Sequence, residues 1–150
     1  MEGRELESIV RQIIDETEKL MPHYMENEED RRIANGNCAA CFIDDQGVIY
    51  GKMFGTNKVR ARQSYRVAWT KASQVHITRL KTGEFEKLAF NSEIDENQFG
   101  IERPDWIGWE GGQLITLQDG TELAVGYSGF RGVIDLEIIV KALEAVNNSK

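Results

Sequence analysis

The sequence predicts one α+β domain in which helices pack against an antiparallel sheet. Its 150 residues are the size of an ordinary single domain. Two pairs of short apolar runs are each joined by turn residues, which predicts two β-hairpins. Longer segments repeat apolar residues every three or four positions, which predicts helices. We divide this domain, 1–150, into an N-terminal helical segment, 1–36, and a core, 37–146.

The N-terminal segment begins with an amphipathic helix. Its apolar stripe consists of Leu6, Ile9, Val10, Ile13, Thr17 and Leu20. Pro22 is expected to interrupt this helix, because a proline interferes with the helical hydrogen bonds. The polar stretch that follows, 23–35, is compatible with a second short helix that ends at Asn35 and Gly36.

Both predicted hairpins have recognisable turns. The first joins strands at 37–43 and 48–54 through Asp44-Asp45-Gln46-Gly47. The second joins strands at 113–118 and 121–128 through Asp119-Gly120, a strong hairpin signal.

Two further helices complete the predicted fold. The central helix, 58–81, has one face made of Tyr65, Ala68, Trp69, Ala72, Val75, His76 and Leu80. Its small alanines, Ala68 and Ala72, would let it closely approach either a sheet or a partner. The last helix, 134–146, buries Ile138, Ile139, Ala142 and Leu143, with Asp135 in its first turn.

The segment 85–109 shows no clear period. It contains Trp106 and Trp109, which suit a ligand pocket or a subunit interface; the alternative is a lid over the core.

Charge and hydropathy exclude several classes of protein. The net charge of −7 repels phosphate backbones, so no nucleic-acid partner is expected. No run approaches the roughly 20 apolar residues of a membrane span, and the first residues do not resemble a secretory signal. We therefore expect a cytoplasmic protein with no membrane partner. The basic stretch 58–81 contains no acid; it is either a solvated helix face or a surface for an anionic ligand or an acidic partner.

The cysteines form one Cys-x-x-Cys motif, Cys38 and Cys41. Such a pair can be a redox dithiol or half of a zinc site. No second motif or close histidine pair completes a zinc site, and residues three apart on a strand point to opposite faces. We therefore expect both thiols to pack in the core, and we predict no metal site.

The order of several short motifs resembles that of a known family. They are Lys71-Ala72, Phe99-Gly100-Ile101, Gly111-Gly112, Asp119-Gly120, Ala124-Val125-Gly126-Tyr127-Ser128-Gly129 and Asp135. Their order and spacing resemble the GlcG/HbpS family of haem-degradation-associated and haem-binding proteins. That family is related to the corrinoid-binding C-terminal domain of PduO-type adenosyltransferases.

This resemblance implies a profilin-like or PAS-like sheet with flanking helices, a homo-oligomer, and binding of haem, a corrinoid or another small molecule. The sequence departs from the family at the first hairpin turn. Val48 and Ile49 follow Gly47 where the family often has a histidine.

The residues that we expect to bind a ligand are Lys71, His76, Trp109, Gly111, Gly112, Ser128 and Arg131. Lys71 matches the family's helix lysine. The Ser128–Gly132 loop precedes a helix, where backbone N–H groups and Arg131 can converge on an anion; the alternative is a tight turn with a solvated arginine. A histidine such as His76, on an apolar helix face, is either a core residue or an axial ligand.

The residues favour a binding protein over an enzyme. Ser128 lacks the glycine pattern of a nucleophile elbow, and no paired acid and base are evident. Two alternatives remain open. One is a small enzyme or accessory subunit that acts on an organic acid or aromatic metabolite, with Lys71, Ser128 and Arg131 in its pocket. The other is an interaction module whose basic helix meets an acidic partner.

Overall fold

A computed structural model describes residues 2–149. Its strands are β1 (Ala39–Ile43), β2 (Ile49–Met53), β3 (Gly112–Thr116) and β4 (Glu122–Ser128). They form one antiparallel sheet in the order β2-β1-β4-β3. The two hairpins therefore join through β1 and β4, where Cys41 pairs with Gly126. The prediction of an α+β domain with both hairpins in one layer is confirmed.

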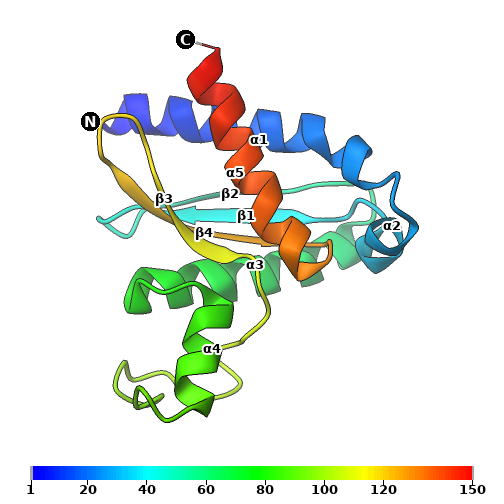
Figure 1. The fold of residues 1–150 in the computed structure, drawn as a ribbon. Coiled ribbons are helices and arrows are strands. Elements are labelled where there is room, and N and C mark those ends of the chain that lie inside the picture. The colour runs from blue at the N-terminus through cyan, green and yellow to red at the C-terminus, as the bar shows by residue number, and fades with distance from the viewer. Residues whose placement is uncertain (1, 150) are drawn as a thin grey trace.

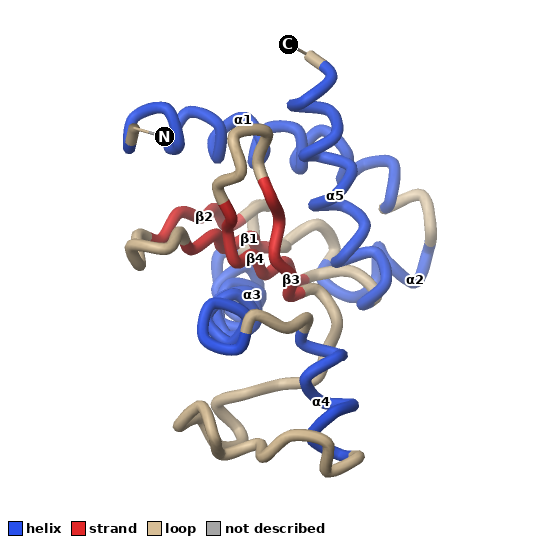
Figure 2. Tube along the Cα trace, turned by 60° about the vertical axis from the view of Figure 1, so that its left-hand side comes forward, coloured by secondary structure: helices blue, strands red, loops and turns tan. Residues whose placement is uncertain are grey.

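Helices cover both faces of the sheet (Figure 1). α1 (Gly3–Tyr24) and α5 (Gly132–Asn148) pack on one face, and α3 (Lys58–Thr78) crosses the other. α2 (Glu28–Ala34) lies beyond the sheet between α1 and β1. α4 (Thr82–Phe90) leads away from α3 into a long loop (Figure 2).

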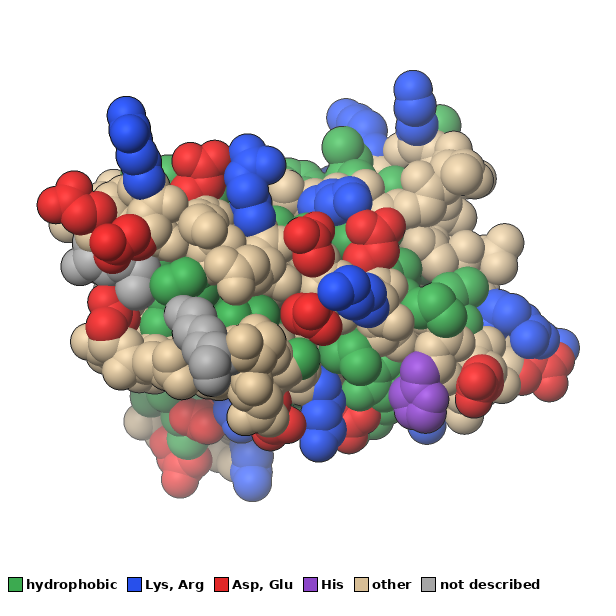
Figure 3. All heavy atoms as spheres, turned by 90° about the horizontal axis from the view of Figure 1, so that it is seen from above, with side chains coloured by type: hydrophobic (Ala, Val, Ile, Leu, Met, Phe, Trp, Pro, Cys, Tyr) green, Lys and Arg blue, Asp and Glu red, His purple; other side chains and the backbone are tan. Residues whose placement is uncertain are grey.

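The main core lies between the sheet and the α1/α5 layer. Its fully buried side chains include Val10, Ile13, Phe42, Leu123, Val125, Tyr127, Ile138 and Ile139. The outer surface of this layer mixes acidic and basic side chains (Figure 3). The Glu7–Arg11 pair is one example. Such exposed pairs contribute little stability, so the apolar interior holds this layer together.

A smaller core lies between the sheet and α3. It consists of Ala39, Cys41, Ile43, Ala68, Ala72, Val75 and Ala124. A Cβ built at Gly126 of β4 would collide with the carbonyl oxygen of Ala68 and lie 2.7 Å from the nitrogen of Ala72. The close approach of this helix, predicted from its two alanines, is confirmed. It requires a glycine in the strand below.

The buried face of α3 differs from the predicted one. Trp69 is 45% exposed and His76 is half-buried. In their place, polar residues face inward and are satisfied by hydrogen bonds. Ser64 donates to the carbonyl of Asn37, and the side chain of Gln74 bonds both backbone groups of Ile107. The apolar pattern predicted the wrong buried face because small and polar side chains of α3, not large apolar ones, contact this face of the sheet.

Helix boundaries supply further corrections. α1 continues through Pro22 to Tyr24, so this proline does not end the helix, although it lacks the N–H that would bond to the carbonyl of Glu18. α2 ends at left-handed Asn35, as predicted. α3 ends at Thr78, before the predicted Lys81, because Arg79 adopts the left-handed conformation.

The helix α4 was not predicted. It lies at 82–90, where the sequence analysis ended the central helix and began an irregular segment. Phe85 anchors it: this ring is fully buried and contacts Trp106 edge-on, with centroids 5.0 Å apart. Trp106 is therefore a core residue of this small unit, whereas Trp109 is 67% exposed.

Both cysteines are free and buried. Cys38 belongs to the main core and Cys41 to the α3 side, so the prediction of core packing is confirmed. Burial raises the pKa of Cys38 to about 12 and that of Cys41 to about 11. Thiols with such high pKa values are unreactive at neutral pH.

None of the helices within residues 2–149 is long and apolar enough to cross a membrane.

Candidate functional site

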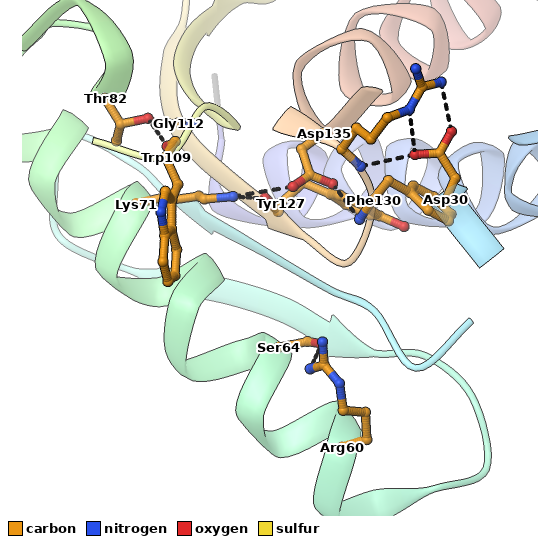
Figure 4. A network of polar contacts seen from close by, with 11 residues as sticks. Asp30, Arg60, Ser64, Lys71, Thr82, Trp109, Gly112, Tyr127, Phe130 and Asp135 are labelled. Atoms are coloured by element: carbon orange, nitrogen blue, oxygen red, sulfur yellow. Dashed lines mark hydrogen bonds and ion pairs between the residues drawn. The ribbon is translucent and has the colours of Figure 1, made fainter. Parts of the chain in front are cut away.

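A buried ion pair connects α3 with α5. The side chain of Lys71 is 2% exposed and that of Asp135 is 4% exposed. Lys71 Nζ donates to the carbonyl of Tyr127 at 2.8 Å and lies 3.2 Å from Asp135 Oδ2. Asp135 Oδ1 accepts the backbone N–H of Phe130 at 2.9 Å. Figure 4 shows how these contacts tie the middle of α3 to the end of β4 and to the start of α5.

Three glycines make room for the lysine. A Cβ at Gly111, whose φ is +126°, would lie 2.7 Å from Lys71 Nζ and 2.9 Å from Asp135 Cβ. A Cβ at Gly126 would lie 2.9 Å from Lys71 Cβ, and one at Gly112 would lie 3.2 Å from it. Real Cβ atoms rarely approach so closely. Gly111 and Gly112 therefore lie behind the lysine and shape its environment, and the positive φ of Gly111 suits glycine in its own right.

The environment disfavours the charged forms of both partners. Burial raises the pKa of Asp135 to about 7, although the charge of Lys71 and the Phe130 N–H oppose this. Burial lowers the pKa of Lys71, although Asp135 and Glu110 oppose this. The two shifts bring the pKa values of amine and carboxyl closer together, which lowers the cost of moving a proton from one to the other.

The pair lies on the wall of a cavity of about 680 Å³. The cavity is lined by Ile33, Arg60, Gln63, Val67, Lys71, Gly108, Trp109, Glu110, Ser128, Gly129, Phe130, Gly132 and Asp135. Of the predicted site residues, it brings together Lys71, Trp109 and Ser128. The indole of Trp109 lies near Lys71 in Figure 4. Trp109 itself is held by Thr82, whose hydroxyl donates to its carbonyl at 2.6 Å and accepts the N–H of Gly112 at 3.3 Å.

The other predicted site residues lie elsewhere. His76 is not among the residues that line this cavity, and its Nδ1 is buried without a hydrogen-bond partner. Arg131 directs its guanidinium to Asp30 of α2, with Nε 3.1 Å from Oδ1 and Nη2 2.9 Å from Oδ2. Its backbone N–H also donates to Oδ1, at 2.9 Å. The expected convergence of Arg131 on a ligand anion is thus replaced by a clamp between α2 and α5.

The clamp changes the pKa of Asp30. Burial alone would raise the pKa of Asp30, but the hydrogen bonds and charge of Arg131 hold it below its usual range. A forked arginine–carboxylate pair of this kind is among the stronger charged hydrogen bonds in proteins. Its energy stabilises the start of α5, and through it the position of Asp135.

A second, larger cavity of about 930 Å³ runs along α3 beside the loop 101–109. It shares Gln63, Val67 and Trp109 with the first cavity and adds Arg66 and Trp69. Trp109 therefore stands between the two. No group of three or more His, Cys, Asp or Glu side chains placed to hold a metal ion occurs in the described part of the chain.

Sequence reasoning missed two members of this site. Asp135 was interpreted as a charge in the first turn of a helix, not as the partner of Lys71, which is 64 residues away. Arg60 was one of several basic residues on the central helix, whereas it lines the cavity and donates to the Ile33 carbonyl. The useful signal was the lysine itself. A single charged residue between Ala68, Ala72 and Val75 requires a buried counter-charge.

No protein-family model and no curated protein matches the sequence. Solved structures do match it. The PduOC:heme complex has a TM-score of 0.64 at 15% identity, covering 98% of this chain and 95% of that chain. Protein ORFY of Klebsiella pneumoniae has a TM-score of 0.65 at 17% identity, covering 93% and 88%. A double mutant of HbpS from Streptomyces reticuli has a TM-score of 0.54 at 16% identity, covering 79% and 82%. The chain therefore has the fold of GlcG/HbpS-like proteins, as its sequence resemblance predicts.

Proposed function

We propose that this chain is a small-ligand-binding protein of the GlcG/HbpS type, which holds its ligand in the 680 Å³ cavity beside Lys71. The observation that carries this proposal is the buried Lys71–Asp135 pair on the cavity wall. A buried pair is weak evidence for stability, whereas perturbed ionisable groups in a pocket are typical of functional sites. The cavity also falls within the usual ligand-pocket range of about 300–1,000 Å³.

The cavity wall suits a flat molecule that carries negative charge. Trp109 and Val67 offer apolar surface, and Arg60 offers positive charge, on the same wall. Because Glu110 and Asp135 also line the cavity, an anionic group is expected to bind toward Arg60 and away from these carboxylates.

Haem and corrinoids are the first ligands to test, since a protein of this fold was solved as a heme complex. The fit is partial. Within residues 2–149, the lining of this cavity contains no histidine, methionine or cysteine. A tetrapyrrole would therefore rest on Trp109, with its carboxylates toward Arg60. Among the described residues of this wall, the amine of Lys71 would be the nitrogen donor for the iron or cobalt that such a group supplies.

The test is a titration of the purified protein with haemin and with cobalamin, followed by Soret or corrin absorbance. Trp109→Ala should weaken binding about tenfold, as expected when one aromatic contact is lost. Its melting temperature should stay unchanged because the side chain is largely exposed. Trp69→Ala is the matched control, an exposed tryptophan outside this cavity.

Equal loss in both variants would place binding elsewhere. No saturable spectral change would remove the tetrapyrroles, and native mass spectrometry of freshly purified protein would then search for other ligands. A chain that carries none, and that binds neither probe, would overturn the proposal.

We also propose that the protein acts as a homo-oligomer in the cytoplasm. Supporting this, α3 leaves Val59, Trp69 and Ile77 at least 42% exposed, an unusual amount of apolar surface for one helix. Free buried cysteines suit a reducing compartment. Light scattering coupled to gel filtration tests the assembly; a monomer at micromolar concentration would contradict it.

A second candidate is a small enzyme or accessory subunit that acts on an organic acid or aromatic metabolite. The observation that favours it is the short hydrogen-bonded path from Lys71 to Asp135. In an activity screen, Lys71→Ala should abolish turnover. Lys52→Ala should leave turnover intact, because its amine pairs with Glu18 at the surface, outside this cavity. Loss of activity in both variants to the same extent would indicate a general folding defect.

A further inference from the structure

We propose that Lys71 acts as a neutral amine that forms an imine with a ligand carrying an aldehyde or ketone group, and that Asp135 carries the proton. This inference rests on the proposed function in one respect, namely that the carbonyl compound enters the same cavity. It adds the chemical class of the ligand and a covalent step.

The geometry around Nζ fits an uncharged amine. A neutral amine has two N–H bonds and one lone pair, and Nζ has two acceptors, the Tyr127 carbonyl at 2.8 Å and Asp135 Oδ2 at 3.2 Å. When both N–H bonds are donated in this way, the lone pair remains free. Lys71 is among the residues that line the cavity, and the cavity is the side from which a carbonyl carbon would reach the nitrogen.

The surroundings of the amine are tightly packed. Both side chains are almost fully buried, and a Cβ at residue 111, 112 or 126 would lie within 3.2 Å of an atom of Lys71. Desolvation is a recognised way to obtain a nucleophilic lysine. The lowered pKa of Lys71 and the raised pKa of Asp135 agree with this arrangement.

The reaction needs no oxidant, reductant or metal. The lone pair of Nζ attacks the carbonyl carbon, and the C=O π electrons move to the oxygen. Asp135 gives its proton to this oxygen and then takes one from the nitrogen, which leaves a carbinolamine. Asp135 next gives that proton to the hydroxyl, which leaves as water while the nitrogen lone pair forms the C=N bond of an iminium. The remaining N–H proton passes to Asp135, which restores the acid and gives the neutral imine. The sum is amine plus carbonyl giving imine plus one water.

The adjoining wall favours an aromatic carbonyl compound. Val67 lies one helical turn before Lys71, and Trp109 lines the same cavity. An aromatic body can rest on these two side chains. Arg60 lies farther along α3 on the same wall, so a carboxylate at the far end of the molecule would be attracted toward it.

The test uses the wild-type protein, 4-carboxybenzaldehyde as the probe, and sodium cyanoborohydride to reduce any imine to a stable secondary amine. Peptide mass spectrometry then gives the initial labelling rate at each lysine. Lys52 and Lys141 are internal controls, because their side chains are 43% and 52% exposed. Lys71 should label at least about tenfold faster than either, since each unit by which its pKa is lowered raises the neutral fraction tenfold.

Labelling of Lys71 only after unfolding, or no faster than the exposed lysines, would overturn the inference. Asp135→Asn gives a second readout. This variant should bind the unreduced probe as tightly as the wild type, measured by tryptophan fluorescence, yet label Lys71 more slowly. A purely structural Asp135 would change both together or neither.

The two proposals can fail separately. If haemin, cobalamin or a co-purified ligand binds and Trp109→Ala weakens that binding, while Lys71 is not labelled, the imine is wrong and ligand binding stands. If Lys71 is labelled selectively but Trp109→Ala leaves all binding unchanged, the amine is reactive and the assigned cavity is wrong.

Discussion

Replacing Lys71 with methionine tests whether the buried pair is needed for the fold. Methionine has a similar length but no amine, so Lys71→Met leaves Asp135 and the Tyr127 carbonyl facing an apolar side chain. Breaking a buried pair by removing one partner costs about 3–5 kcal/mol. Typical domains unfold at about 5–15 kcal/mol, so the variant should fold but with a much smaller margin.

The loss of folding stability in Lys71→Met should depend on pH. Without Lys71, the pKa of Asp135 loses its largest opposing influence and rises further above about 7. A carboxyl whose folded pKa exceeds its unfolded value, 3.8, holds a proton in the folded state that the unfolded state releases. Stability is then fully present below about pH 4 and falls by up to about 1.4 kcal/mol per unit as pH rises through this window. The negative charge of Asp30 acts in the same direction.

Urea unfolding at pH 5 and pH 8, followed by circular dichroism, measures this difference. Lys71→Met should lose about 1–3 kcal/mol at pH 5, mainly from the unpaired carbonyl and altered packing, and about 3–5 kcal/mol at pH 8. Lys52→Met is the control, because its amine pairs with Glu18 at the surface and should cost at most about 1 kcal/mol at either pH. A loss at Lys71 that is equal at both pH values would refute the view that Asp135 is a buried, titrating carboxyl.

Three further predictions follow from packing. Gly111→Ala should destabilise the protein by at least about 2 kcal/mol in urea unfolding, because it adds a clash to a positive φ; Gly47→Ala, also at positive φ but with open space, should cost less, and equal losses would contradict the clash. Cys38 and Cys41 should resist a thiol reagent in the native protein and react fully after unfolding; fast native labelling would show that the strand is not buried. Phe85→Ala should cost about 3 kcal/mol and speed proteolysis of the loop that follows α4; unchanged proteolysis would mean that this ring does not order the loop.

Strand pairing could be predicted because its signals are local. Asp119-Gly120 marks one hairpin, and the turn residues before Val48 mark the other. The expectation that the two hairpins share one sheet rested on the order of the elements and on the family resemblance. Neither the pairing of Cys41 with Gly126 nor the strand order could be derived from any one segment.

The errors on α3 have a common cause. Helical periodicity identifies a buried face only where large apolar side chains mark it. Because Trp69 was counted as a buried residue, the predicted buried face of α3 was rotated from the observed one. Ser64 and Gln74 lie inside because backbone groups of distant segments accept their hydrogen bonds. Those partners are invisible in a sequence. The same reason explains why Asp135 and Arg60 were not assigned to the site although Lys71 was.

The close packing of α3 on the sheet determines how deeply the Lys71 amine is buried. Because Ala68 and Ala72 bring this helix directly onto β4, the aliphatic part of the Lys71 side chain lies between helix and sheet, next to Gly126. The amine at its end reaches Asp135 in the first turn of α5. A larger residue at either alanine would lift α3, lengthen the 3.2 Å contact between Nζ and Oδ2, and open the amine to water.

Ala72→Leu should therefore return the labelling rate of Lys71 to that of an exposed lysine while the protein stays folded. If Lys71 in the folded variant still labels as fast as in the wild type, the close packing of α3 does not control its reactivity.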